Sequence, residues 1–458
     1  MFWSDENLSA IFGETADLNR RRLRCGSFEL WAYSIDGLVL SGSISDYVFK
    51  PIVETLTGNT MGALYTAALS GGIYNAVAVP CKDIQDAAMK LVNGFCVILF
   101  PGIGALAFEV KTGEKRSISA PELENTAKGA KDGFTETVRT NTSLIRRHLR
   151  SPDLRLQETQ VGSRSMTNVS VVWLEGVTPK IYVTRLIQRL RQIRTDGLLT
   201  PAAVEELVSG SRTTAFPMLQ YTQRTDRFCE GLIQGRVGLF VDGIPLGYLL
   251  PVDMGELMES MEDYSHDFVT ASGIRILRYA ALLLDLLLPA LYVAMTVFHW
   301  DWIPDSLAQV ILQGRQNVPF SPIWEILPLL IAFELLQESG VHLPQSIGQS
   351  VSIIGGIVVG TVGVEAGLIS SVALIAVSLA GVCGFVLPNR DLADAVRIWR
   401  FLIAAMAALL GLWGIALGMA CLLLHLVRLK SLGRSYLRLA RSGLLRRLTK
   451  TDKKDEEK

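Results

Sequence analysis

The sequence lacks the short motifs that most often mark an enzyme. A nucleophile elbow, an HExxH zinc motif, a GxxxxGKS or GxxxxGKT phosphate loop and EF-hand spacing are all absent from its 458 residues. Histidine is scarce, with five residues, and the six cysteines form no CxxC pair. We therefore expect reduced thiols, no metal site, no cofactor and no catalytic residues. The chain is not expected to be an enzyme.

An excess of either charge is also missing, because 44 basic residues balance 44 acidic ones. Hydrophobic residues nevertheless make up 49% of the chain, and its mean hydropathy is positive. These figures fit a soluble part joined to a membrane part better than one globular domain. The first residues show no basic start followed by an apolar core, so we expect no cleavable signal peptide and a cytosolic N-terminal region.

The first part of the chain has the pattern of a mixed α/β fold with an internal repeat. Residues 91–102 and 232–243 each combine a helix end, a glycine stop, a buried strand and a glycine turn. We infer two related cytosolic α/β subdomains at 1–115 and 136–258. A polar linker is expected between them at 116–135.

A basic helix is expected at the start of the second subdomain, over residues 134–149. It ends in a run that includes Arg146, Arg147 and Arg150. A solvated helix face is the simplest interpretation of these arginines. An acidic neighbour or lipid head groups would use the same charges.

The longest apolar run, residues 349–387, contains one formal charge, Glu365, and no proline. A helix needs about 20 apolar residues to cross the hydrocarbon of a bilayer, so this run has enough for two crossings. Ser370 and Ser371 are a plausible turn between them. The run is therefore predicted to be a membrane hairpin.

The first half of this hairpin is predicted to have two different faces. Small residues at four-residue spacing let helix backbones approach closely in a membrane. The helix-packing candidates are Ser352, Gly356, Gly360, Gly363 and Gly367. The other face carries candidates for a pore lining or gate, namely Ile354, Val358, Val362 and Glu365. Apolar constrictions gate channels and acidic rings select cations, although a structural carboxylate satisfied by a neighbouring helix is the alternative for Glu365.

The whole membrane domain is predicted to be all-α and polytopic, over residues 259–427. Its expected crossings are 276–298, 349–368, 371–387 and 401–427. The basic tail at 428–458 places the C-terminus in the cytosol. Both ends inside require an even number of crossings, so 322–338 is expected to enter the membrane without crossing. This arrangement puts residues 389–400 outside despite their three arginines.

Two further acids are expected within the membrane part. Asp285 lies four residues before Pro289 in the first predicted crossing, and Glu334 lies in the inserted segment. Ionisable residues at this depth are costly and usually face protein or water. Proline also leaves a backbone carbonyl near residue 285 without its helical partner, so the acid and the kink are expected to form one feature.

Several segments together resemble the A-type subunits of the GerA family of bacterial spore germination proteins. The membrane half carries Leu288-Pro-Ala-Leu-Tyr-Val-Ala294, Gly348-Gln-Ser-Val-Ser-Ile-Ile-Gly355, Glu365-Ala-Gly367 and Arg397-Ile-Trp-Arg-Phe401. The front half carries Asn141-Thr-Ser-Leu-Ile-Arg-Arg-His-Leu149 and Gly235-Arg-Val. The motifs occur in family order over nearly the whole chain. A paralogue encoded with the stage V sporulation proteins shares them.

This resemblance implies a subunit of a nutrient germinant receptor in the inner membrane of a dormant spore. Such subunits act with a transporter-like B subunit that senses the nutrient and with a lipoprotein C subunit. They are thought to form a homo-oligomeric ring in membrane lipid that releases cations when germinant binds, and no nucleic acid is implied. A membrane scaffold or signal relay without conduction stays open as the alternative. A secondary transporter is less favoured, because transporters commonly repeat within the membrane.

Overall fold

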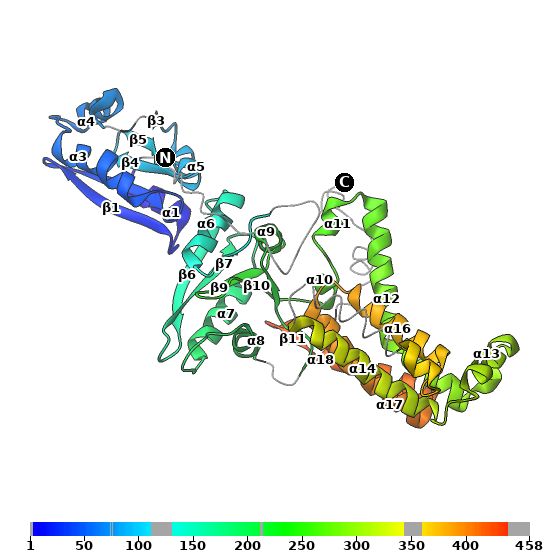
Figure 1. Ribbon diagram of the computed structural model, residues 1–458. Coiled ribbons are helices and arrows are strands. Elements are labelled where there is room, and N and C mark those ends of the chain that lie inside the picture. The colour runs from blue at the N-terminus through cyan, green and yellow to red at the C-terminus, as the bar shows by residue number, and fades with distance from the viewer. Residues whose placement is uncertain are drawn as a thin grey trace. The chain divides into compact units, whose positions relative to one another are not determined.

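The structure is a computed structural model that describes residues 3–73, 75, 77–110, 131–210, 214–342 and 360–437, with backbone alone at 337 and 339–342. The chain forms two compact units (Figure 1). The first comprises Met1–Arg212 and Leu219–Pro251, and the second comprises Thr213–Met218 and Val252–Lys458. The first unit is α/β, as predicted. The second is almost entirely helical.

The first unit begins with a five-stranded antiparallel sheet in the order β1-β2-β4-β5-β3. Its strands are β1 Leu18–Cys25, β2 Phe28–Ile35, β3 Ala78–Pro80, β4 Phe95–Phe100 and β5 Gly104–Glu109. The covering segments are helices α1 Asp5–Phe12, α2 Ser41–Ile44, α3 Lys50–Glu54, α4 Met61–Ala67 and α5 Ile84–Val92, with π-helical turns at Ser45–Phe49 and Ala68–Gly72. Successive strand residues point to opposite faces. Leu30 and Tyr33 of β2 therefore belong to two different apolar cores, one on each face.

A second five-stranded antiparallel sheet follows in the order β6-β7-β9-β10-β8. Its strands are β6 Leu154–Val161, β7 Thr167–Leu174, β8 Gln220–Thr222, β9 Val237–Val241 and β10 Gly247–Leu250. The helices are α6 Val138–His148, α7 Lys180–Gln192, α8 Pro201–Ser209 and α9 Thr225–Ile233. The pairing order matches that of the first sheet element for element. The similar segments 91–102 and 232–243 lie at equivalent places, where a helix leads into the central strand.

Close packing of a phenylalanine explains two glycines in the second sheet. Phe228 of α9 stacks on Phe240 of β9, with ring centroids 4.5 Å apart. A Cβ on Gly238 would lie 2.2 Å from the Phe228 ring, and one on Gly247 would lie 2.6 Å from it. The ring occupies the space that side chains at these two strand positions would need, so glycine is required there for packing.

Arg146 of α6 is fully buried, which corrects the expected solvated face. Its Nε and Nη2 atoms donate to the two carboxylate oxygens of Asp17 over 2.7 and 3.0 Å. Its Nη1 atom donates to the carbonyl of Ser151 over 3.1 Å. The bidentate pair satisfies an otherwise costly buried guanidinium. Asp17 precedes β1, so this pair links the two halves of the α/β unit.

The second unit is organised around one long helix, α12 Phe268–Phe298 (Figure 1). Helices α10 Met254–Leu257 and α11 Glu262–Ser265 precede it, and a 3₁₀ turn at Trp300–Trp302 follows it. The later helices are α13 Asp305–Arg315, α14 Pro322–His342, a short helix at 360–365, α16 Ser371–Phe385, α17 Arg390–Leu410 and α18 Leu412–Arg428. Strands β11 Lys430–Ser431 and β12 Arg434–Ser435 form a small hairpin after α18. Within the described residues, α12 is the one helix both long and apolar enough to cross a membrane, and α16 and α18 are shorter apolar helices.

Contacts along α12 give the directions of its neighbours. The Tyr292 hydroxyl lies 3.1 Å from that of Ser370 at the start of α16, and Asp285 lies against Gly384 near the end of α16. The two helices are therefore antiparallel. Ser370 caps α16 by accepting from the backbone N–H of Ala373. The turn itself lies just before it, at residues 366–369, and Ser371 is already the first residue of α16.

The predicted continuous crossing over 401–427 is wrong, because the helix breaks at Gly411. This residue has a positive φ of +60° and separates α17 from α18. A Cβ on Gly414 would lie 2.0 Å from the carbonyl oxygen of Met406, so the two helices touch backbone to backbone just after the turn. Trp399 and His425 lie side by side farther along, with ring centroids 5.6 Å apart. Helices α17 and α18 therefore form an antiparallel hairpin.

Replacing Arg146 with methionine should strongly destabilise the chain. The change keeps most of the apolar volume but leaves the Asp17 carboxylate buried without its cation, at a cost of about 3–5 kcal/mol. Thermal unfolding of the full chain in detergent measures this loss. The control is Arg150→Met at an exposed position two residues after α6. Equal stability of the two variants would show that the buried pair does not hold this unit together.

Candidate functional site

A cluster of charged side chains lies inside the helical unit. Asp285 of α12 has none of its surface exposed and Arg400 of α17 has 2% exposed. The Arg400 Nη1 atom donates to Asp285 Oδ1 over 2.5 Å. Arg397, one turn earlier, donates to Glu334 of α14 over 3.0 Å, and Arg400 Nη2 lies 3.7 Å from the same carboxylate. These two acids and two arginines bring three helices together.

Local sequence explains how this cluster is assembled. Arg397 and Arg400 are three residues apart and so project from one face of α17. On the α16 side the space is kept free by Gly384, where a Cβ would lie 3.3 Å from Asp285 Oδ2. Asp285 stands one turn before Pro289, which cannot donate to the carbonyl of residue 285. The structure therefore places the predicted acid one turn before the proline of a continuous helix, paired with a side chain from another helix.

The cluster is incompletely hydrogen-bonded. Asp285 Oδ2, Glu334 Oε2 and Arg400 Nε have no hydrogen-bond partner among the residues that the structure describes. Most buried polar atoms in folded proteins are paired, so three unpaired atoms at one place are unusual for the interior of an apolar unit. The sequence predicted Asp285 and Glu334 as embedded acids. It missed the roles of Arg397 and Arg400, whose signal was two arginines one turn apart at the entrance to an apolar helix.

The residues predicted for a pore lie elsewhere in this unit. Val362 is 54% exposed and Glu365 is also exposed on the short helix at 360–365. Among the described side chains, neither residue forms a hydrogen bond or an ion pair with the charge cluster. Ile354 and Val358 lie outside the described residues. A pore-lining role for Val362 and Glu365 stays a prediction.

Three of the predicted packing glycines face other parts of the same chain. A Cβ on Gly360 would lie 3.2 Å from Leu374 of α16, and one on Gly363 would lie 2.9 Å from Ile369. Gly367 has a φ of +68°, and a Cβ there would lie 3.0 Å from the carbonyl oxygen of Asn317. The other two candidates, Ser352 and Gly356, are outside the described part of the chain.

Ser431 and Arg434, which follow α18, form a set of polar contacts that the sequence did not suggest; we call these contacts the clamp. The predicted tail at 428–458 begins with the β11–β12 hairpin. Ser431 Oγ donates to the carbonyl of Met218 over 2.7 Å and accepts from the N–H of Val252 over 3.1 Å. Met218 is the last residue before the chain leaves the helical unit, and Val252 is the first residue after it returns. One serine therefore ties these two points of the chain together.

An ion pair strengthens the same clamp. Arg434 lies 2.8 Å from the carboxylate of Asp253 and 3.1 Å from that of Glu256. Asp253 and Glu256 form a capping box at the start of α10, where each side chain accepts from the other's backbone. The arginine thus holds the first helical turn after the α/β unit.

Comparison with known sequences decides the family. The model of the Bacillus/Clostridium GerA spore germination protein family matches residues 6–451. The chain belongs to the GerA family. Spore germination protein B1 of Bacillus subtilis (strain 168) is 32% identical to this GerA chain over 88% of it and 83% of the relative. Spore germination protein A1 of the same organism is 34% identical over 78% and 75%.

Two further comparisons concern a relative named only as a membrane protein and a solved structure. The B. subtilis (strain 168) protein named uncharacterized membrane protein YfkQ is 34% identical over 94% of the GerA chain and 84% of its own length. Among solved structures, the N-terminal domain of the A subunit of the Bacillus megaterium spore germinant receptor GerK3 is similar at 24% identity with a TM-score of 0.42. That similarity covers 53% of the GerA chain and 91% of the solved one.

Replacing Arg400 with methionine should destabilise the GerA chain by about 3–5 kcal/mol, because Asp285 then stays buried without a cation. The double variant Asp285→Leu with Arg400→Met should be more stable than the single variant, since neither member of the pair remains charged. Thermal unfolding in detergent compares them. Arg390→Met, at the exposed start of α17, is the control. A double variant less stable than Arg400→Met would contradict this interpretation.

Proposed function

We propose that this chain is the A subunit of a nutrient germinant receptor of bacterial spores and acts as an oligomeric cation channel in the spore inner membrane. Its family and the names of its relatives support a role in spore germination. A transporter-like B subunit that senses the germinant and a lipoprotein C subunit are the proposed partners. Channel opening would follow germinant binding to the partner.

The helix directions support a polytopic arrangement with both ends of the membrane part in the cytosol. Gly411 lies against Phe298, and Arg400 pairs with Asp285, so α17 runs parallel to α12. Helix α16 runs antiparallel to α12, and α17 and α18 form a hairpin. One end of the bundle therefore holds the starts of α12 and α17 together with the ends of α16 and α18.

Charges at those ends set the orientation. Arg275 near the start of α12, Arg390 at the start of α17 and Arg428 at the end of α18 lie toward one end of the bundle. Trp300 and Trp302 lie at the other, beyond the end of α12. By the positive-inside tendency the arginine end faces the cytosol. This topology places α17's arginines inside, which removes the difficulty of a basic segment at 389–400 on the outer side.

The channel proposal rests on one observation. Val362 and Glu365 are exposed, whereas the glycines next to them in sequence pack against the chain itself. Gly360 and Gly363 face the chain's own α16 side, whereas the valine and the acid face away from it. A second copy would meet these exposed side chains first. Repeated around a ring, they would form an aliphatic constriction with an acidic rim, which are the elements of a gated cation path.

A scaffold or signal relay is the second candidate. The Asp285–Arg400 pair and the Ser431 clamp tie the helical unit internally, which suits a subunit that transmits movement. Conduction distinguishes the candidates. Current through the purified subunit in planar bilayers supports the channel. No current, even from a variant with a widened constriction, favours the relay.

Val362→Ala is that widened variant, because it removes two methyl groups from each copy at the proposed constriction. Spores carrying it should release potassium without germinant, and Glu365→Gln should reduce cation current by removing one charge from each subunit. The matched control is Val382→Ala, at an exposed valine of α16. Normal dormancy of Val362→Ala spores, with normal current from Glu365→Gln, would exclude this helix from the pore.

Membrane topology can be measured by cysteine labelling. In a Cys421→Ser background the five remaining cysteines are buried. An impermeant maleimide should then label Arg390→Cys from the cytosolic side of sealed vesicles and Trp302→Cys from the opposite side. Labelling of both positions from one side would contradict the proposed orientation of α12 and α17.

A further inference from the structure

Glu325 is another buried acid of the helical unit and lies apart from the charge cluster of Asp285, Glu334, Arg397 and Arg400. It lies in the first turn of α14 with 1% of its surface exposed. One carboxylate oxygen, Oε1, accepts from the backbone N–H of Ser370, which helps to hold the start of α16. The other oxygen, Oε2, has no hydrogen-bond partner among the described residues. A structural role for Glu325 accounts for one oxygen and leaves the second unexplained.

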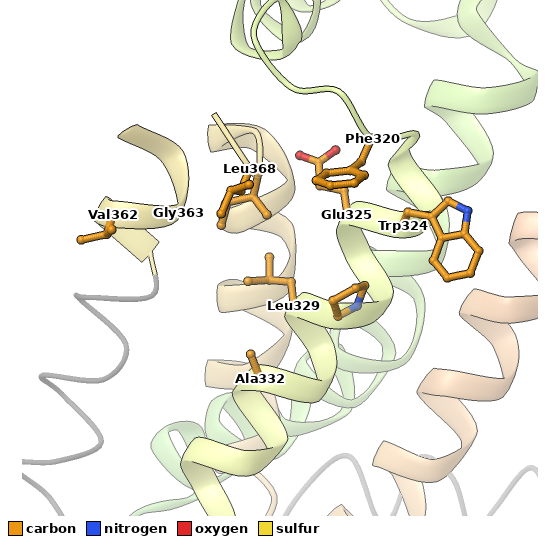
Figure 2. A pocket seen from close by; sticks show the side chains of 10 residues that line it. Phe320, Trp324, Glu325, Leu329, Ala332, Val362, Gly363 and Leu368 are labelled. Atoms are coloured by element: carbon orange, nitrogen blue, oxygen red, sulfur yellow. The ribbon is translucent and has the colours of Figure 1, made fainter. Parts of the chain in front are cut away.

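The side chain of Glu325 lines an apolar cavity of about 860 Å³ (Figure 2). One wall comes from α14 and the residues just before it, and the other comes from residues 362–369. The apolar lining residues are Phe320, Trp324, Pro328, Leu329, Ala332, Val362, Leu368 and Ile369. Glu325 is the one ionisable side chain in this lining. A volume of this size is typical of sites for small molecules.

Arg315 is a basic residue close in sequence to this cavity, but its side chain binds a group other than Glu325. Arg315, at the end of α13, donates to the backbone carbonyl of Phe320 over 3.0 Å. It is not within salt-bridge distance of Glu325 in the described structure, where the free Oε2 atom stays unpaired. A buried carboxylate oxygen without a donor is costly, so a ligand that supplied an N–H to it would be stabilising.

We propose that this cavity binds a primary ammonium group carried on a small apolar body. The Oε2 atom of Glu325 would accept from the ammonium, and the ring of Trp324 or Phe320 would contact its charge. The aliphatic lining would cover the apolar body. An anion is disfavoured by the carboxylate, and a metal ion is disfavoured because no cluster of three or more candidate ligands exists among the described residues. Val362 and Gly363 form one wall, so the ligand would contact the short helix that also carries Glu365.

Binding of hexylammonium to the full chain in phosphatidylcholine nanodiscs tests this proposal without any use of channel activity. Isothermal titration should show saturable binding, and hexanol, which is neutral and of similar size, should bind at least about tenfold more weakly. Glu325→Gln should weaken hexylammonium binding by about tenfold or more, as expected for the loss of a hydrogen bond to a charged group. Asp305→Asn, at an exposed acid of α13, should bind like the unchanged chain.

A second variant covers the case in which Glu325→Gln does not fold. Ala332→Trp would fill the cavity from α14 without removing the acid, and it should abolish binding. Equal binding of hexanol and hexylammonium, binding that survives Ala332→Trp, or no saturable binding to the unchanged chain would each overturn the proposal. Phosphatidylethanolamine in the nanodiscs identifies the source: competition with hexylammonium supports a lipid head group as occupant, and no competition supports a free amine.

Discussion

The ion pair between Asp285 and Arg400 decides how the helical unit is arranged. A carboxylate without exposed surface in an apolar helix must find a cation, because an unpaired buried charge is far more costly than a paired one. The guanidinium comes from α17, so the first half of α17 has to lie along α12. Gly384 lets α16 approach the same carboxylate. The acid thus fixes which faces of three helices meet.

Other contacts extend this constraint along the unit. Glu334 shares Arg397 and Arg400 and so places α14 against the same cluster. Ser431 contacts Met218 and Val252, where the chain leaves and re-enters the helical unit, and Arg434 pairs with Asp253 beside them. All of these contacts are hydrogen bonds or ion pairs between polar groups, and those of Ser431 and Arg434 connect the boundary segments of the helical unit to the residues after α18.

Features that depend on the residues of a single helix or strand could be predicted from the sequence. The period of apolar residues and the glycine stops placed buried strands within 91–102 and 232–243, where β4 and β9 lie. Asp285 was noticeable because a charge in an apolar run has to be explained. Ser370 stood out as a turn because the apolar run on both sides of it was too long for one helix.

Contacts between side chains on different elements could not be predicted in this way. Arg146 has the same spacing as solvated arginines, and only the fold brings Asp17 to it. Gly411 resembles any packing glycine of an apolar helix, so its positive φ and the reversal of the chain were missed. Arg400 belonged to a recognisable motif, but its pairing with a residue 115 positions earlier in the chain depends on how helices pack.

Charge reversal at the Asp285–Arg400 pair is the most direct measurement of whether this contact organises the helical unit. Asp285→Arg and Arg400→Asp should each abolish the germination response of spores that depend on this chain, because like charges would then be buried together. The double reversal, which restores opposite charges at the same two positions, should recover a response and a folded protein. Full activity in either single variant, or a double variant as defective as both singles, would contradict the arrangement described above.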